Sequence, residues 1–181
     1  MKQFFTADPH FFHKNIIKYC NRPFKNVEEM NKGLIDNWNL VVGDNDIVYV
    51  IGDFALGTHK VEEIIKSLKG KIHLIIGSHE KVALRSKNLF YKVSYKHTTK
   101  IGSQLVFIDH YCHKVWDRSH YGSWHLFGHS HGKLDEYSKS EGKLLDVGVD
   151  QHNYFPWSEE EVIELMETRP LNFNDLSKFK N

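Results

Sequence analysis

The chain has 181 residues, of which 40% are hydrophobic and 13% aromatic, enough for one globular domain that buries about 70% of its unfolded surface. Its 24 Lys and Arg residues nearly balance 23 Asp and Glu residues, so long-range attraction to nucleic acid or to an anionic membrane is not indicated. Cys20 and Cys112 lie far apart in sequence and predict neither a disulfide nor a thiolate metal site.

No stretch of the sequence approaches the roughly 20 apolar residues that a membrane-spanning helix needs. The N-terminus enters a strand-like pattern at Gln3 without the apolar core of a signal peptide. We therefore expect a cytoplasmic protein with no membrane partner.

Apolar runs of strand length recur along the chain, and they are rich in Val, Ile and Phe and bounded by Gly or Asp. The predicted strands are Gln3–Ala7, Ile47–Ile51, Lys71–Ile76, Gln104–Ile108, Trp124–Phe127 and Leu144–Val149. Helical patterns separate the early strands, whereas the later strands cluster. This order predicts a mixed α/β sheet protein.

Two amphipathic helices are predicted between the early strands. Apolar residues within Val27–Trp38 fall on one helical face, with Asn26 as the N-cap and Glu29 as its capping-box partner. A second apolar stripe covers Val61–Leu68 and is stopped by Gly70.

A third helix is predicted near the C-terminus. It begins at Ser158, where Glu161 completes a capping box, and ends before Pro170. We expect residues 1–170 to form one domain and residues 171–181 to form a polar tail that frays.

The chain contains 13 histidines, and His is the side chain that most often binds metals and moves protons near neutral pH. Exposed imidazoles without a role would give the same composition, so position must decide between the two interpretations. Acidic or His residues follow five predicted strands, in the segments Asp8-Pro9-His10, Gly52-Asp53, Gly77-Ser78-His79-Glu80, Asp109-His110 and Gly128-His129-Ser130-His131-Gly132.

These segments share one edge of the predicted sheet structure, because loops at the carboxyl ends of strands in open α/β sheets gather ligands. An isolated Asp-x-His is common by chance. It is uncommon by chance for five strands each to bring a carboxylate or an imidazole to the same edge of a sheet. The neighbouring glycines permit the tight turns that aim these side chains at one place. The pattern predicts a metal site.

The string Asp-x-His, Gly-Asp, Gly-x-His-Glu, His and Gly-His-x-His resembles the calcineurin-like metallophosphoesterase superfamily. The resemblance to small bacterial and phage members spans about residues 4–165 and includes Phe11–Ile17, Arg22-Pro23-Phe24 and Asp146–Asp150. The fold that the resemblance implies is a four-layer α/β/β/α sandwich of two mixed β-sheets flanked by helices.

The resemblance also implies a ligand set for two metal ions. One ion is held by Asp8, His10 and His131, the other by His110 and His129, and Asp53 bridges them. A carboxylate between two divalent cations offsets their repulsion, and the mixture of oxygen and imidazole ligands suits Mn, Fe, Zn or Ni better than Mg or Ca.

The implied activity is metal-dependent hydrolysis of a phosphodiester or phosphomonoester by a metal hydroxide. His79 resembles the histidine that protonates the leaving group, and Glu80 is expected to orient that imidazole or to raise its pKa. The alternative for His79 is a loop residue that is hydrogen-bonded to backbone.

Position 78 departs from the superfamily pattern, in which Asn precedes the leaving-group histidine and binds the second metal ion through its amide oxygen. Ser78 has a shorter side chain, so the second metal site is expected to be weakened, compensated by solvent or deliberately altered. A catalytically weakened or inactive metal-binding member that acts as an interaction module is therefore the alternative function.

The expected substrate is a small phosphoester, with a nucleotide favoured and a nucleic acid considered only as a substrate. A chain of 181 residues leaves little room for a specificity domain, which favours an open site. His13 and Arg22 are the predicted phosphate-binding residues, although each could equally be solvated. The aromatic residues considered for base stacking, or for packing alone, are Trp116, Tyr121, Trp124 and Tyr154.

Overall fold

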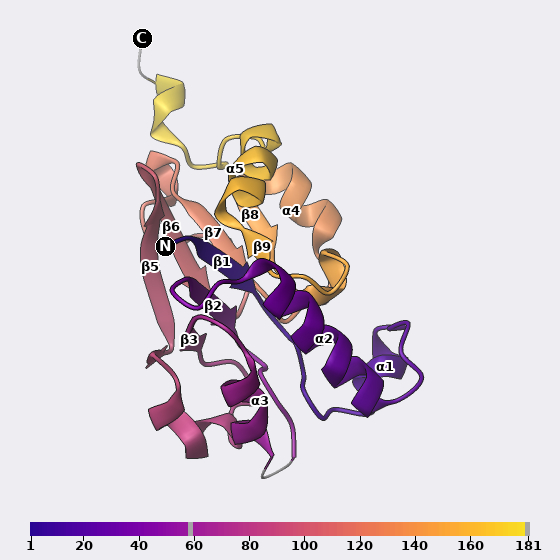
Figure 1. Cartoon of the computed structure of the whole chain (residues 1–181). Helices are drawn as coiled ribbons and strands as arrows, with labels where there is room; N and C mark the ends of the chain where they lie inside the picture. Colours follow the sequence, from indigo (N-terminus) through magenta and orange to yellow (C-terminus); the bar gives the residue numbers. More distant parts are fainter. Residues whose placement is uncertain (58–59, 180–181) are drawn as a thin grey trace.

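The computed structural model describes residues 1–57 and 60–179 and contains two mixed β-sheets flanked by helices (Figure 1). The first sheet has the strand order β4 (Lys92–Ser94), β3 (Lys71–Ile75), β2 (Ile47–Ile51), β1 (Gln3–Thr6) and β9 (Trp157–Ser158). The second sheet has the order β5 (Lys96–Ile101), β6 (Gln104–Asp109), β7 (Trp124–Phe127) and β8 (Leu144–Asp146). The predicted mixed α/β class is confirmed.

Most neighbouring strands are parallel. β9 and β5 run antiparallel to their neighbours, and the other pairs in both sheets run parallel. The register places Thr6 of β1 beside Val50 of β2, and Ile51 beside Ile75 of β3. The carboxyl ends of these strands therefore reach the same edge of the sheet.

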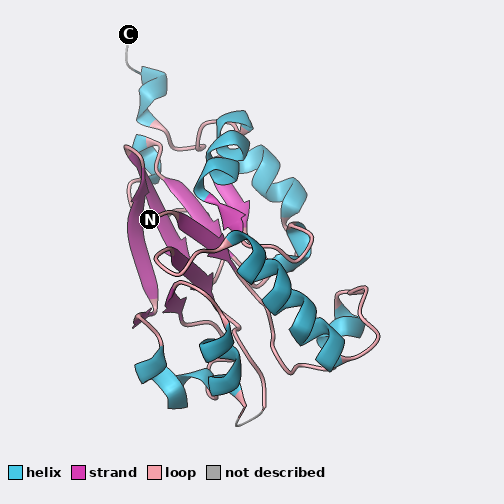
Figure 2. Cartoon of the chain, viewed as in Figure 1, coloured by secondary structure: helices cyan, strands magenta, loops and turns pink. Residues whose placement is uncertain are grey.

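Alternation along β2 shows how the layers form, because successive side chains of a strand point to opposite faces. Val48 and Val50 pack with residues of α2 (Val27–Val41) and α3 (Val61–Ser67), whereas Tyr49 and Ile51 pack with the second sheet. Helix α4 (Asp135–Glu141) packs on the other face of the second sheet (Figure 2). The order of layers is thus helix, sheet, sheet, helix.

The predicted helix caps are present, with one difference. The Asn26 side chain accepts the Glu29 N–H at 2.8 Å, but the Glu29 carboxylate accepts the N–H of Lys25 rather than that of Asn26. At α5 (Glu159–Thr168), Ser158 and Glu161 form the complete capping box, and the helix ends before Pro170 as predicted.

Some elements were not predicted. Strand β5 alternates between exposed and partly buried residues, so it lacks the apolar run that marked the other strands. The predicted strand at residues 144–149 ends early at Asp146, because Val149 turns to donate its N–H to Ala7 in the first sheet. The further helices are α1 (Ile16–Tyr19) and the 3-10 helices η1 (Ala83–Leu89), η2 (Ser119–Tyr121), η3 (Val149–Gln151) and η4 (Leu176–Phe179).

The prediction that the whole C-terminal tail frays is wrong for its first residues. Asn172 and Asp175 are buried, and the Asn172 amide donates to the backbone oxygens of Ser119 and Ser123. These hydrogen bonds fasten the segment to the end of the second sheet.

Among the described residues, no helix is long and apolar enough to cross a membrane.

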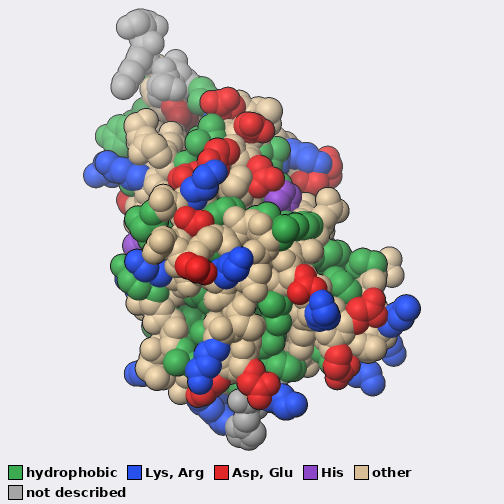
Figure 3. All heavy atoms as spheres, in the orientation of Figure 1, with side chains coloured by type: hydrophobic (Ala, Val, Ile, Leu, Met, Phe, Trp, Pro, Cys, Tyr) green, Lys and Arg blue, Asp and Glu red, His purple; other side chains and the backbone are tan. Residues whose placement is uncertain are grey.

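Charged side chains of both signs are interspersed over the face shown in Figure 3. This distribution agrees with the near balance of 24 basic and 23 acidic residues in the sequence. The face shown therefore has no single-sign surface of the kind that attracts nucleic acid at long range.

Candidate metal centre

The loops after β1 and β2 lie side by side at the carboxyl edge of the first sheet. The N–H of Asp8 donates to the oxygen of Gly52 at 3.1 Å, and that of His10 to the oxygen of Asp53 at 3.0 Å. The loop after β7 joins them, because the N–H of His129 donates to Oδ2 of Asp8 at 2.7 Å. Ligands from both sheets therefore converge on one place.

The backbone at this place is strained. A left-handed conformation is uncommon in residues other than Gly and costs on the order of 1–3 kcal/mol, and such residues cluster at functional sites. The predicted ligands with positive φ angles are Asp8 (56°), His10 (52°), Asp53 (51°), His129 (66°) and His131 (47°). Five of the six predicted ligands thus share a conformation that local propensity disfavours.

Two glycines permit the close approach of the loops. A Cβ atom at Gly52, where φ is +84°, would lie 2.1 Å from Nδ1 of His110. A Cβ atom at Gly128 would lie 2.6 Å from Oδ2 of Asp8. Any side chain at either position would displace a predicted ligand.

Asp53 lies between the two predicted metal positions. Its Oδ2 atom is 3.6 Å from Nε2 of His10, and its Oδ1 atom is 3.5 Å from Nε2 of His110. Besides a third group of Cys20, His131 and Asp150, two clusters have ligand atoms within 4.8 Å of one another: Asp8, His10 and His131, and Asp53, His110 and His129. This division matches the one that the resemblance implied.

Three buried ligand atoms have no hydrogen-bond partner: Oδ1 of Asp8, Nε2 of His10 and Nε2 of His110. A buried polar atom without a partner is costly and calls for an explanation. All three residues belong to the two clusters. Carboxylate oxygen and imidazole nitrogen are ligands that divalent transition metals accept, so the residues fit such ions.

Burial and hydrogen bonds shift the pKa values of these groups. Burial raises the pKa of Asp8 well above its usual range and lowers the pKa of His10 to about 2. Burial also lowers the pKa of His131, but hydrogen bonds to Asp150 and Cys20 and the charge of Asp8 outweigh it and raise the pKa to about 10.

Ser78, the residue that departs from the superfamily pattern, lies against the central carboxylate. Its hydroxyl is 3.1 Å from Oδ1 and 3.0 Å from Oδ2 of Asp53. The backbone N–H groups of Ser78 and His79 each donate to Oδ1 of Asp53 at 2.8 Å. The loop after β3 therefore fixes the orientation of Asp53 through three donors.

The carboxylate of Glu80, the residue predicted to orient His79, contacts backbone N–H groups. The Glu80 carboxylate is buried and accepts the N–H groups of Phe54 and Gly77, each at 2.9 Å. Burial raises its pKa to about 7 against the lowering effect of these hydrogen bonds. Glu80 instead ties the loop after β2 to the loop after β3, because its position directs the side chain inward.

His79 and His13 lie at the rim of the centre. The His79 side chain is 45% exposed, and its Nε2 atom is 4.0 Å from Oδ2 of Asp53. The ring centroids of His79 and His13 are 6.4 Å apart, and Nδ1 of His13 is 3.3 Å from Nδ1 of His10. Both imidazoles can therefore meet a molecule that enters from solvent.

The prediction that Arg22 binds substrate is wrong. Its guanidinium is buried and donates to the backbone oxygens of Asp8 and Pro9 at 2.8 and 2.9 Å. It also forms two hydrogen bonds with the carboxylate of Asp150. Sequence reasoning missed Asp150 as a site residue, although it ended one of the segments that carried the family resemblance.

The centre opens into a cleft of about 650 Å³. Its lining includes His10, His13, Asp53, His79, His129 and His131 together with Ile16, Tyr19, Cys20, Leu56 and Lys133. A cavity of similar volume, about 680 Å³, lies beside Lys2 and Phe4. The first cleft is the candidate site, because its lining includes His10 and His131 of one cluster and Asp53 and His129 of the other.

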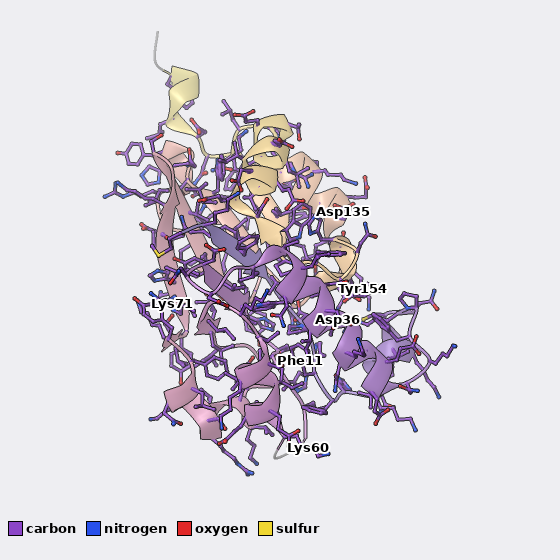
Figure 4. The ribbon with its side chains drawn as sticks, in the orientation of Figure 1. Phe11, Asp36, Lys60, Lys71, Asp135 and Tyr154 are labelled. Carbon is purple, nitrogen blue, oxygen red and sulfur yellow. The ribbon has the colours of Figure 1, made fainter. Side chains whose placement is uncertain are left out.

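The aromatic residues predicted to stack or pack are mainly packing residues. Trp116 and Trp124 are buried in the hydrophobic cores. Tyr154, labelled in Figure 4, packs against Phe24 with ring centroids 5.0 Å apart. Tyr19, which sequence reasoning did not single out, lines the cleft and is 68% exposed.

Comparisons with known proteins place the chain among uncharacterised relatives, and no family model matches it. The gene 66 protein of Mycobacterium phage L5 is 34% identical over 80 residues, which cover 42% of this chain and 38% of that protein. The crystal structure of a protein of unknown function, AQ665 from Aquifex aeolicus, covers 91% of this chain and 98% of its own. Its TM-score of 0.71 at 22% identity shows a shared fold.

A longer match is found in Methanocaldococcus jannaschii. The uncharacterized protein MJ1445 of that organism is 39% identical over 175 residues, which cover 92% of this chain and 92% of that protein. The chain therefore belongs to the same family as MJ1445.

Proposed function

We propose that this chain is a dinuclear metal-dependent phosphoesterase of the calcineurin-like metallophosphoesterase superfamily, with the four-layer metallophosphatase fold. One observation carries the proposal: the buried atoms Oδ1 of Asp8, Nε2 of His10 and Nε2 of His110 have no hydrogen-bond partner. The two imidazole atoms lie 3.6 and 3.5 Å from the carboxylate of Asp53, and Oδ1 of Asp8 lies 4.0 Å from Nε2 of His10. The motif string in the sequence and the helix, sheet, sheet, helix layering support it.

The first ion would be held by Asp8, His10 and His131, the second by His110 and His129, and both by Asp53. When bound, a pair of divalent cations supplies the charge that lowers the pKa of water and stabilises an in-line displacement at phosphorus. Asp53 suits the shared position, because each of its oxygens faces a different histidine.

His79 is the proposed proton donor to the leaving oxygen. It is half-exposed at the rim, and its Nε2 atom lies 4.0 Å from Asp53, so it can contact a phosphoester seated at the centre. His13 and Lys133 line the same cleft and would attract the anionic phosphoryl oxygens. Tyr19 offers an exposed ring to an aromatic group such as a nucleobase.

The alternative, a metal-binding interaction module without hydrolysis, rests on Ser78. Its hydroxyl donates to the bridging carboxylate, whereas the Asn of the superfamily pattern offers an oxygen to the second ion. The Ser78 side chain is therefore engaged with the Asp53 carboxylate and is not placed as a further ligand of the second ion. The two functions differ in whether metal-loaded protein turns over a phosphoester.

The test is Mn²⁺-dependent release of nitrophenol from an aryl phosphodiester by the wild type and by Ser78→Asn. We expect turnover in the wild type and faster turnover in the variant, with two ions bound per chain in both. Asp53→Asn serves as the inactive control. No turnover by either protein while metal is bound would refute the enzyme and favour the interaction module.

The substrate class is tested separately with Mn²⁺-loaded protein. The panel comprises cyclic nucleotides, dinucleotides and single-stranded oligonucleotides, because the lining of the cleft combines the cationic side chain of Lys133 with the exposed ring of Tyr19. Preference for a nucleotide over an alkyl phosphoester of equal charge is the expected result.

A further inference from the structure

One buried arginine connects the loop that carries Asp8 with η3, which carries Asp150. The guanidinium of Arg22 donates through Nη2 to the backbone oxygen of Asp8 at 2.8 Å and through Nη1 to that of Pro9 at 2.9 Å. The same group donates to Asp150, from Nε to Oδ1 at 2.8 Å and from Nη2 to Oδ2 at 2.9 Å. The Arg22 side chain is 0% exposed and that of Asp150 is 8% exposed.

Asp150 in turn contacts a predicted ligand. Its Oδ2 atom lies 2.8 Å from Nδ1 of His131. An ionised carboxylate only accepts hydrogen bonds, so Nδ1 of His131 carries the hydrogen and donates it. This leaves Nε2 as the ring nitrogen whose lone pair is available to a metal ion, and carboxylates that hold a metal-binding His in this way fix both its tautomer and its ring orientation.

We propose that Arg22 and Asp150 act as a positioning clamp for the first metal site: Asp150 orients His131, and Arg22 holds Asp150 against the backbone of Asp8. The proposal rests on the proposed function, because it assigns the clamp to one of the two metal sites. The clamp joins two non-bridging ligands, Asp8 and His131, that lie more than a hundred residues apart in sequence.

Burial makes the clamp effective. Charge-assisted hydrogen bonds are roughly twice as strong as neutral ones, and a bidentate Arg–carboxylate pair also fixes geometry. Asp150 receives both arms of this pair and also accepts from Nδ1 of His131. The hydrogen bonds that hold Asp150 in place therefore also fix the position of His131.

The second cluster has a separate support. Nδ1 of His110 lies 2.9 Å from the backbone oxygen of Ile51 and donates its hydrogen to it. Neither Arg22 nor Asp150 takes part in that contact. Loss of the clamp is therefore expected to weaken the first site and to leave the second site intact, which a general loss of stability would not do.

The experiment is titration of metal-free protein with Mn²⁺, followed by electron paramagnetic resonance, for the wild type, Asp150→Ala and Asp150→Asn. Loss of an outer contact of this kind typically lowers metal affinity 10- to 100-fold. We expect Asp150→Ala to weaken one of two sites by about that factor and to leave the other within about twofold. The Mn²⁺ affinity of the first site in Asp150→Asn should lie between those of the wild type and Asp150→Ala. Its amide oxygen still accepts the hydrogen bond from His131 but carries no negative charge.

Glu161→Ala is the matched control for destabilisation. It removes the capping box of α5 and is expected to cost about 1 kcal/mol of stability, but Glu161 belongs to neither metal-ligand cluster. Both Mn²⁺ affinities should match the wild type. Equal weakening of both sites in Asp150→Ala and in Glu161→Ala would overturn the clamp and reduce it to a stabilising contact.

A spectroscopic readout follows the hydrogen bond directly. In Co²⁺-loaded protein, the N–H protons of metal-bound imidazoles give shifted proton resonances. We expect the His131 proton to be protected from exchange with water in the wild type and exposed in Asp150→Ala, whereas the His110 proton is unchanged. An unprotected His131 proton in the wild type would contradict the clamp.

The outcomes separate the clamp from the proposed function. A wild type that binds two ions and hydrolyses a phosphoester, with an Asp150→Ala variant that binds both ions equally well, would refute the clamp alone. A wild type that binds no Mn²⁺ and no Co²⁺ would refute the proposed function and the clamp with it.

Discussion

Nε2 of His110 lies 3.5 Å from Oδ1 of Asp53, although His110 follows a strand of the second sheet and Asp53 a strand of the first. The contact joins the two sheets at their shared carboxyl edge. It also places the Asp53 carboxylate where its two oxygens face histidines of both clusters, His10 and His110. Asp53 is therefore the first residue to test.

Asp53→Asn should remove turnover while the protein stays folded. The amide keeps the shape of the side chain but loses the negative charge and one of the two oxygens that face His10 and His110. We expect Mn²⁺-dependent activity to fall more than about a hundredfold and fewer than two ions to bind. Metal content after dialysis and circular dichroism check the two parts. Full activity in this variant would contradict the assignment.

His79→Gln should slow hydrolysis in proportion to the difficulty of the leaving group. A proton donor contributes about 10²–10⁴-fold when the leaving group is a poor one. We expect a loss of this size for a methyl or nucleoside leaving group and a much smaller loss for nitrophenolate, which departs without a proton. Both metal ions should remain bound. An equal loss for the two substrates would argue that His79 only positions substrate.

Gly52→Ala should disrupt the second cluster specifically. The new Cβ atom would lie 2.1 Å from Nδ1 of His110, so that imidazole must move. Gly102→Ala is the matched control, because Gly102 also has a positive φ (+57°) but nothing lies within 4 Å of its added Cβ atom. The control should lose about 1–2 kcal/mol of stability from backbone strain alone and keep both metal sites.

Comparison of the two glycine variants needs metal titration and urea unfolding. Gly52→Ala should lose more stability than Gly102→Ala and should bind one Mn²⁺ less tightly. The idea that His110 needs this close approach is untenable if the two variants lose equal stability and bind both ions as the wild type does.

Buried His125 should make stability fall with acid. Its Nε2 atom accepts the N–H of His113 at 3.1 Å, which requires a neutral ring, and burial lowers its pKa to about 4. Between pH 4 and 6.5 the unfolded chain therefore binds more protons at this position than the folded chain does. The free energy of unfolding therefore rises with pH through this window, and protonation of His125 in the unfolded chain accounts for a change of about 3 kcal/mol between its two ends.

Urea unfolding between pH 4 and 7 checks this prediction. His125→Gln should reduce the overall stability, because a buried contact is changed, and should flatten the dependence on pH. An unchanged slope would show that other groups account for the acid sensitivity.

Tyr19→Ala should weaken the binding of nucleotide substrates. Stacking of a base on an aromatic side chain contributes about 1–3 kcal/mol, so KM for a nucleotide diester should rise about tenfold with little change in kcat. Tyr121→Ala is the control, because Tyr121 is equally exposed (68%) but lines a different cavity, beside the C-terminal segment. An equal rise in KM for both variants, or for neither, would remove Tyr19 from the substrate site.

The sequence alone was sufficient for features that depend on near neighbours. The capping box of Ser158 and Glu161 and the cap of Asn26 involve residues three positions apart, so their pattern predicts the contact. Apolar runs of Val, Ile and Phe located most strands that border the core. The parallel order of those strands then brought their carboxyl ends to one edge, and the six predicted ligands lie there.

Only the tertiary structure decided which polar side chains face the cleft. Arg22 and Glu80 have the residue types of a substrate or catalytic site, but the first turns inward to Asp150, 128 residues away, and the second caps two backbone N–H groups. Strand β5 was not predicted because it lies at the edge of its sheet and consists mainly of polar residues, so it has no apolar run. Such outcomes depend on hydrogen bonds and burial between distant segments, which the packing of the two sheets sets and which no local pattern of residues encodes.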